Sequence, residues 1–178
     1  MAEAGGLAIS RGIPLGEEPG IGALTLPGFL REVVERHGKA EAVVEHGPQG
    51  RVAWSYEEMR ERAMAVARAL IACGTGRDSR VGILMTNRIE WVSACFGVAL
   101  AGGTVVGLST FSTGDELDQL LRASGISVLL FEPRVLGRDF AGLLRELEPG
   151  IDAELPGWLR SARYPFLRRL VSVDPAGE

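Results

Sequence analysis

Helical patterns alternate with short apolar runs along most of this chain, and this alternation restricts the possible folds more than any other feature. Each of the three central helical patterns begins with a Ser, Asn or Thr placed three residues before a glutamate, which is the spacing of a helix-capping pair. Each of these helices leads into an apolar run of strand length. We therefore expect a layered α/β fold with a doubly wound, mostly parallel sheet and helices on both faces. The capping pairs are Ser55 with Glu58, Asn87 with Glu90, and Thr113 with Glu116.

The hydrophobic periodicity also places the individual elements. Residues 47–50 read Gly-Pro-Gln-Gly and predict a hairpin turn between the first two strands. The expected strands span residues 42–45, 51–54, 80–85, 104–108, 126–131 and 170–173. The expected helices span residues 27–37, 55–73, 88–101, 136–147 and 157–163, with a further helix starting at Thr113.

The composition is that of one soluble globular domain. The chain has 178 residues, of which 46% are hydrophobic and 24% charged, and its net charge is −4. These values exclude a disordered chain, and the acidic balance argues against nucleic acid as a partner. Residues 1–24 are rich in glycine and small side chains, so we expect a flexible leader there and a single α/β domain over residues 25–178.

The sequence predicts a cytoplasmic protein with no transmembrane segment. The leader lacks the basic and apolar regions of a secretory signal. Residues 91–114 carry no charge, but Gly102 and Gly103 interrupt the run, so a buried helix followed by a buried strand explains it better than a membrane span. The two cysteines, Cys73 and Cys95, lie in apolar helical patterns, which favours buried free thiols in a reducing compartment.

A search for chemistry along the chain finds no catalytic, cofactor-binding or metal-binding residue to nominate. Lys39 is the only lysine and follows the glycine that ends a helix, so it belongs to no phosphate loop. Residues 74–76 (Gly-Thr-Gly) follow a helix rather than a strand and read as a helix stop. His37 and His46 lie beside glycines without a partner for zinc binding or nucleophilic catalysis. Glu57 and Glu58 are adjacent on a helix and point in different directions.

The segment 158–169 is unusual because it combines four arginines and three aromatic residues with no acidic residue. Such a mixture can bind a membrane surface or single-stranded nucleic acid. The favoured interpretation is a short amphipathic segment that packs its aromatic side chains on the domain, or on a part of the protein outside this sequence. The residues concerned are Arg160, Arg163, Arg168 and Arg169 with Trp158, Tyr164 and Phe166.

Read in order, several short motifs resemble the N-terminal region of the adenylate-forming (AMP-dependent) synthetases, and most closely acyl-CoA synthetases. The resemblance covers about residues 26–132, and the order and spacing of the motifs carry it rather than any single one. Gly107 departs from the family, in which many members have proline at this point. The motifs are residues 54–59 (Trp-Ser-Tyr-Glu-Glu-Met), 80–83 (Arg-Val-Gly-Ile), Asn87, 90–91 (Glu-Trp), 100–106 (Leu-Ala-Gly-Gly-Thr-Val-Val) and 113–117 (Thr-Gly-Asp-Glu-Leu).

The resemblance implies a two-step reaction, in which ATP and a carboxylic acid give an acyl-adenylate and coenzyme A then takes the acyl group. The segment 108–112 (Leu-Ser-Thr-Phe-Ser) is most similar to fatty-acyl or aryl-acyl ligases. The family binds ATP and Mg²⁺ through a glycine-rich loop that ends in Pro-Lys-Gly and through later motifs, and none of these motifs occurs in this sequence. No catalytic residue can therefore be carried over to this chain.

Two interpretations of the chain stay open. In the first, it is the N-terminal part of a larger ligase, inactive alone, with the remainder of that ligase as its partner and with an exposed sheet edge that promotes self-association. In the second, it is a complete, non-catalytic α/β binding or interaction module. The resemblance favours the first interpretation. Neither identifies the carboxylic acid.

Overall fold

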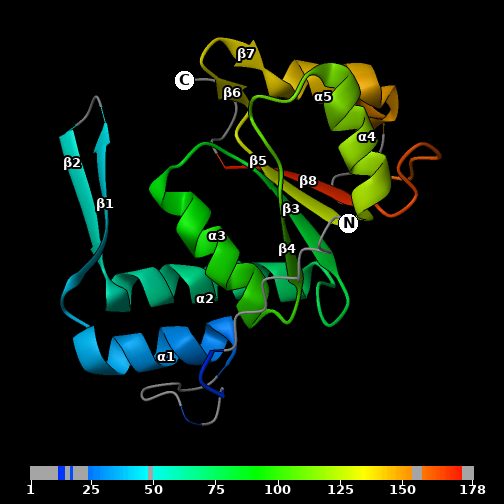
Figure 1. Cartoon of the computed structure of the whole chain (residues 1–178). Helices are drawn as coiled ribbons and strands as arrows, with labels where there is room; N and C mark the ends of the chain where they lie inside the picture. The colour runs from blue at the N-terminus through cyan, green and yellow to red at the C-terminus, as the bar shows by residue number, and fades with distance from the viewer. Residues whose placement is uncertain (1–11, 15–16, 18–23, 48–49, 154–157, 174–178) are drawn as a thin grey trace, which may run out of the picture.

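The computed structural model of the chain describes residues 12–14, 17, 24–47, 50–153 and 158–173. Four parallel strands form its central sheet, in the order β4-β3-β5-β8 (Figure 1). In this order, Val81 of β3 pairs with Val105 of β4 on one side and with Val128 of β5 on the other. The parallel sheet expected from the sequence is thereby confirmed. Its strands are β3 (Arg80–Leu84), β4 (Thr104–Gly107), β5 (Val128–Phe131) and β8 (Arg169–Ser172).

Helices cover both faces of the sheet, as expected. Helices α2 (Tyr56–Ala72) and α3 (Ile89–Leu100) cover one face, and α4 (Gly114–Ser124) and α5 (Phe140–Leu147) lie over the other (Figure 1). The strand side chains alternate between two apolar clusters, because successive residues of a strand point to opposite faces. Val128 and Leu130 of β5 pack with α2 and α3, whereas Leu129 and Phe131 pack with α4 and α5.

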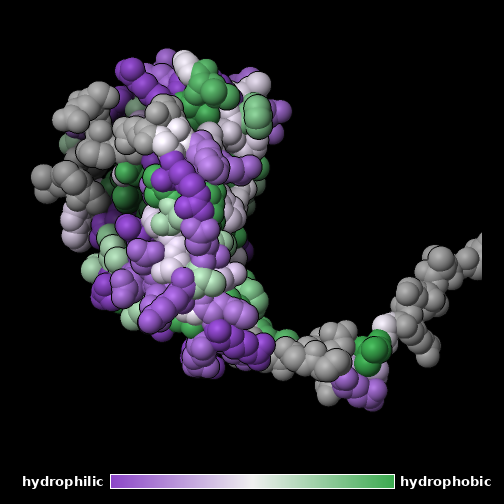
Figure 2. All heavy atoms as spheres, turned by 90° about the vertical axis from the view of Figure 1, so that its left-hand side faces the viewer, coloured by the Kyte–Doolittle hydropathy of each residue, from purple (hydrophilic) through white to green (hydrophobic). Residues whose placement is uncertain are grey.

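The N-terminal part of the fold forms a third apolar cluster beside the first helix layer. It comprises α1 (Leu26–His37) and the antiparallel hairpin of β1 (Glu41–Gly47) and β2 (Gly50–Ser55). Buried Leu30 of α1 and Trp54 of β2 pack there against Ile89 of α3. The hairpin stands at one side of the molecule, and Figure 2 shows that side with hydrophilic residues predominating along its middle and hydrophobic residues near its upper end.

Two of the three predicted capping pairs are confirmed, and the third is wrong. Ser55 with Glu58 and Thr113 with Glu116 form complete capping boxes at α2 and α4. Asn87 does not cap α3, whose N-cap residue is Arg88 with no side-chain cap bond. The backbone N–H of Ile89 instead donates to a carboxylate oxygen of Glu45 in β1, at 3.1 Å. The cap therefore comes from a residue that is distant in sequence, which a local pattern cannot reveal.

The region after β5 differs from the helix expected over residues 136–147. A small hairpin of β6 (Arg134–Val135) and β7 (Arg138–Asp139) comes first, and α5 begins at Phe140 after an Asp139 cap. Leu136 and Gly137 both have positive φ, of 48° and 82°, as a two-residue hairpin turn requires. A short 3₁₀ helix, η2 (Pro149–Asp152), follows α5.

Three further expectations concern local features. The helix expected over residues 157–163 is wrong for 158–163, which form no helix, and Gly157 lies outside the described residues. Most of the expected leader 1–24 also lies outside them. Cys73 and Cys95 are free, but both are half-buried rather than fully buried.

The uncharged run 91–114 proves to be most of α3, the strand β4 and the loop that leads into α4. Among the helices that the structure describes, none combines the length and hydropathy needed to cross a bilayer. In α3 the run is uncharged because this helix packs in the domain interior, whereas the loop after β4 is partly exposed, with Phe111 at 85%.

Candidate functional site: a pocket at the carboxyl ends of the strands

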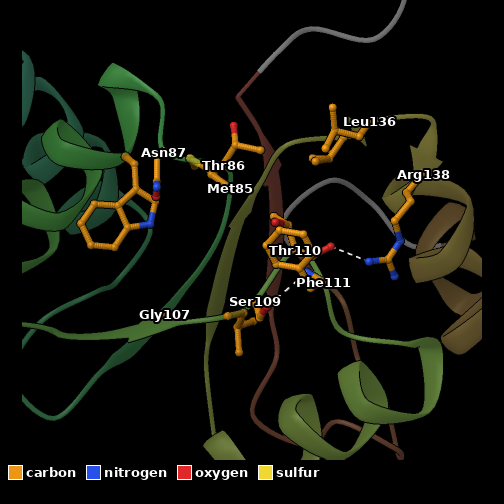
Figure 3. Close-up of a pocket in the computed structure, with 12 residues that line it drawn as sticks. Met85, Thr86, Asn87, Gly107, Ser109, Thr110, Phe111, Leu136 and Arg138 are labelled. Carbon is orange, nitrogen blue, oxygen red and sulfur yellow. Dashed lines mark hydrogen bonds between the residues drawn. The ribbon is translucent and has the colours of Figure 1, made fainter. Parts of the chain in front are cut away.

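A pocket of about 440 Å³ lies at the carboxyl edge of the parallel sheet. Within the sheet, β4 lies on one side of β3 and β5 lies on the other. Such a reversal of strand order leaves a crevice at the carboxyl ends of the strands. Residues 85–87 after β3 form one wall, and residues 107–111 at the end of β4 form another. The β6–β7 hairpin contributes Leu136 and Arg138 to the opposite side (Figure 3).

Glu132, just after β5, ties two strand ends together beside the pocket. One of its carboxylate oxygens accepts hydrogen bonds from the backbone N–H of Thr86, at 3.0 Å, and from the Thr86 hydroxyl, at 2.8 Å. Its other oxygen lies 3.6 Å from a guanidinium nitrogen of Arg88. Since Glu132 and Arg88 are both mostly buried, this contact holds the β3–α3 connection in a fixed position.

Arg138 holds the loop after β4 in place from the other side. Its guanidinium donates to the backbone carbonyls of Thr110 and Ser112 and lies 4.8 Å from the centre of the Phe140 ring. In Figure 3, Arg138 reaches across from β7 toward Thr110. The anchored loop presents Phe111, which is 85% exposed, at the mouth of the pocket.

The lining of the pocket suits binding rather than proton transfer. Arg138 is the only ionisable residue among the described residues that line it, and its donors already serve backbone carbonyls. The remaining polar groups are the neutral side chains of Thr86, Asn87, Ser109 and Thr110. The pocket can therefore take an apolar group and orient it with a few hydrogen bonds.

None of the residues considered in the sequence as a source of chemistry lines this pocket. His37 lies in the last turn of α1 with its ring 6.3 Å from that of Tyr56, and His46 is exposed in β1. Lys39 is exposed after α1. Gly74, with φ of 85°, ends the α2 region, which confirms the helix stop.

The residues present do not fit a site for ATP and Mg²⁺. A nucleotide site needs clustered backbone amides and a cation for the phosphates, and Lys39 has neither a glycine-rich loop nor a strand end beside it. Across the part of the chain that the structure describes, no three His, Cys, Asp or Glu side chains are grouped to hold a metal ion. That no cofactor-binding or metal-binding residue lies in this chain stays a prediction.

Sequence reasoning missed most of the residues that build the pocket. Asn87 was expected to cap a helix, and instead its exposed side chain lines the pocket. Arg138 was placed inside a predicted helix, so the sequence did not indicate that it anchors the loop after β4. Two signals were usable: the alternation of helix and strand, which places the ends of 80–85 and 104–108 at one edge, and the segment 108–112 of the family resemblance, of which residues 108–111 line the pocket.

The arginine-rich segment is fixed to α4 by a buried polar network around Asp118. This side chain is 5% exposed and accepts hydrogen bonds from the Tyr164 hydroxyl at 2.6 Å and from Arg163 Nε at 2.8 Å. Arg122 donates to its second oxygen at 2.5 Å. The Arg163 and Tyr164 hydrogen bonds lower the pKa of Asp118 to about 2. Burial, with the neighbouring carboxylate, raises the pKa of Tyr164.

Comparison with known proteins agrees with this architecture. The family model described as AMP-binding enzyme matches residues 30–156, so the chain belongs to the AMP-binding enzyme family. The chain is 30% identical over 140 residues to the acyl-CoA ligase SID4 of Ajellomyces capsulatus. The aligned region covers 78% of this chain and 23% of that protein. It is 26% identical over 145 residues to the mitochondrial medium-chain acyl-CoA ligase ACSF2 of Bos taurus, across 82% of this chain and 23% of that one.

A solved fatty acyl CoA synthetase from Mycobacterium tuberculosis has the same fold over this region. The superposition has a TM-score of 0.63 at 24% identity and covers 84% of this chain and 26% of the other. The domain is therefore that of the N-terminal region of adenylate-forming synthetases, as the sequence motifs predicted. The chain spans about a quarter of the length of the curated relatives it matches.

Proposed function

We propose that this chain forms the N-terminal part of an AMP-forming acyl-CoA ligase that acts in the cytoplasm in fatty-acid metabolism. Such a ligase joins ATP and a carboxylic acid into an acyl-adenylate and then transfers the acyl group to coenzyme A, with Mg²⁺ bound to the nucleotide. The observation that carries the proposal is the family match over residues 30–156, which includes the strands β3, β4 and β5 of the parallel sheet and the helices that cover it.

A fatty or aryl carboxylic acid is the proposed substrate class. Similar proteins include a medium-chain acyl-CoA ligase and a structure described as an anthranilate CoA ligase, which cover the aliphatic and the aromatic case. The mainly apolar pocket at the carboxyl edge is compatible with either class. In this proposal the chain contributes scaffold and part of a cavity wall, while the groups that activate the carboxylate lie in other parts of the ligase.

The first test asks what form the protein takes in its source cells. An antibody against residues 26–132 is used to capture the native polypeptide, and its intact mass is measured. The proposal expects a species several times heavier than 19.0 kDa. It also expects the captured material to release pyrophosphate from ATP with a medium-chain fatty acid or with anthranilate.

The purified chain of 178 residues is the matched comparison. It is expected to release no pyrophosphate with the same acids, ATP, Mg²⁺ and coenzyme A. A native species of 19.0 kDa that lacks ligase activity would reject the proposal and favour the interaction module. Activity of the purified chain alone would reject the assignment of catalysis to other parts of a ligase.

A further inference from the structure

The loop of residues 158–168, which leads into β8, sorts its side chains into an inner and an outer set. The inner set is buried and anchors the loop on α4 and α5; it consists of Leu159, Ser161, Tyr164 and Leu167. Trp158 and Phe166 point outward and are 61% and 62% exposed. The anchor is reinforced by the Tyr164–Asp118 hydrogen bond and by a hydrogen bond from the Leu159 N–H to the Arg168 carbonyl, at 3.1 Å. The exposed aromatic side chains are therefore not needed to hold the loop.

The outer set also includes two exposed arginines, Arg160 and Arg168, which make it positively charged. Arg163 shares the single carboxylate of Asp118 with Arg122, and no acidic side chain among the described residues lies within ion-pair distance of Arg160 or Arg168. Trp158, Arg160 and Arg168 line one recess of about 440 Å³ together with Pro165. A protein whose net charge is −4 thus carries, on one anchored loop, a local cationic surface with protruding aromatic rings.

We propose that this loop docks the protein on an anionic phospholipid surface. Arginine side chains bind the phosphate headgroups, while Trp158 and Phe166 enter the interfacial layer, where aromatic side chains are favoured. Single-stranded nucleic acid fits less well, because it needs an extended basic groove with stacking platforms, and the chain as a whole is acidic. The loop lies on the side of the fold away from the β1–β2 hairpin, so docking leaves that hairpin clear of the membrane (Figure 1).

Vesicle flotation with the full chain tests the proposal. The chain is expected to float with vesicles of phosphatidylcholine and phosphatidylglycerol, but not with phosphatidylcholine alone. Raising the salt from about 0.1 M to about 1 M is expected to release it, since screening shortens the reach of the charges. Arg160→Ala combined with Arg168→Ala is expected to weaken binding about tenfold or more.

A charge-matched control removes two exposed arginines elsewhere, Arg36→Ala with Arg77→Ala, and is expected to retain binding. If both double variants lose binding equally, the effect is one of net charge and the proposed docking surface is rejected. Equal binding to neutral and anionic vesicles, or preferential binding to a single-stranded oligonucleotide, would also reject it. Circular dichroism of each variant separates loss of binding from loss of fold.

Tryptophan fluorescence gives an independent readout of insertion. The emission is expected to shift to the blue on adding anionic vesicles and to be quenched by brominated lipid chains, because exposed Trp158 leaves water. The other two tryptophans lie in apolar clusters, Trp54 buried and Trp91 partly buried. Trp158→Phe is therefore expected to abolish the shift while retaining most of the flotation. A shift that persists in this variant would show that the loop does not enter the bilayer.

Discussion

The face of the sheet under α2 and α3 and the face under α4 and α5 are covered in different ways. On the first face, two long helices lie close against each other and their apolar side chains fill the space above the strands. On the second face, the helices are shorter and the irregular loop 158–168 completes the cover. That loop depends on the polar network of Asp118 as well as on burial. Within one domain, regular helix packing covers one face of the sheet, and a loop held by a buried polar network completes the cover of the other.

The largest predicted effect comes from the close contact of α2 and α3. A Cβ atom at Gly97 would lie 2.6 Å from the Cβ of Val66 and 3.0 Å from the carbonyl oxygen of Ala63. Gly97→Val forces the helices apart, so we expect it to lower the free energy of unfolding by about 3 kcal/mol. Urea denaturation measures this change. Gly76→Ala is the control, because nothing lies within 4 Å of a Cβ there, and equal losses in both variants would contradict the close-contact argument.

The polar anchor of the second face predicts a smaller effect. Tyr164→Phe removes the hydroxyl that donates to Asp118, and we expect a loss of about 2 kcal/mol in the free energy of unfolding. Tyr56, the other tyrosine, is only partly buried in the N-terminal cluster. Tyr56→Phe is therefore expected to stay within about 0.5 kcal/mol of the parent. Similar values for the two variants would mean that the network does not stabilise the loop.

The two faces were not equally predictable from the sequence. The first was predictable because α2 carries a local capping box and a continuous apolar stripe, and because β3 carries no polar side chain after Arg80. The second was predicted only in part. The β6–β7 hairpin was read as helix, because Leu136 at a turn position with positive φ gives no turn signal. A helix was expected over 157–163, and residues 158–163 instead form a loop, since its shape depends on Asp118, which is 46 residues away from Tyr164.

The pocket was the least predictable part of the molecule. The sequence places the ends of β3 and β4 at one edge, but the contacts that shape the pocket join residues far apart in the chain. Thr86 and Glu132 are separated by 46 residues, and Arg138 and Thr110 by 28. None of these pairs belongs to a recognisable motif. Short-range patterns therefore predict elements, whereas the site arises from how the elements meet.

A third prediction concerns the long-range cap of α3. Glu45→Ala leaves the Ile89 N–H without its carboxylate acceptor, so the free energy of unfolding is expected to fall by about 1 kcal/mol. Glu41 of the same strand makes only an exposed ion pair with Arg51. Glu41→Ala is expected to cost less than about 0.5 kcal/mol. Thermal unfolding of both variants ranks the two contacts, and the reverse order would show that Glu45 does not cap the helix.

The last prediction is a pH dependence that arises from the polar anchor of the second face. The pKa of Asp118 is about 2 in the folded chain, against an ordinary value of 3.8, because Arg163 and Tyr164 hydrogen-bond to the charged form. Between these values the unfolded chain binds a proton that the folded chain does not, so this contribution to stability falls as the pH drops from about 4 to about 2. Asp118→Asn removes the titrating group, and its unfolding free energy is expected to vary less over this range. Asp152→Asn, at an exposed ion pair with Arg145, is the control and is expected to keep the parent slope. Should Asp118→Asn also keep that slope, the acid sensitivity of the domain would have to arise elsewhere, and the anchor of the second face would depend on packing rather than on charge.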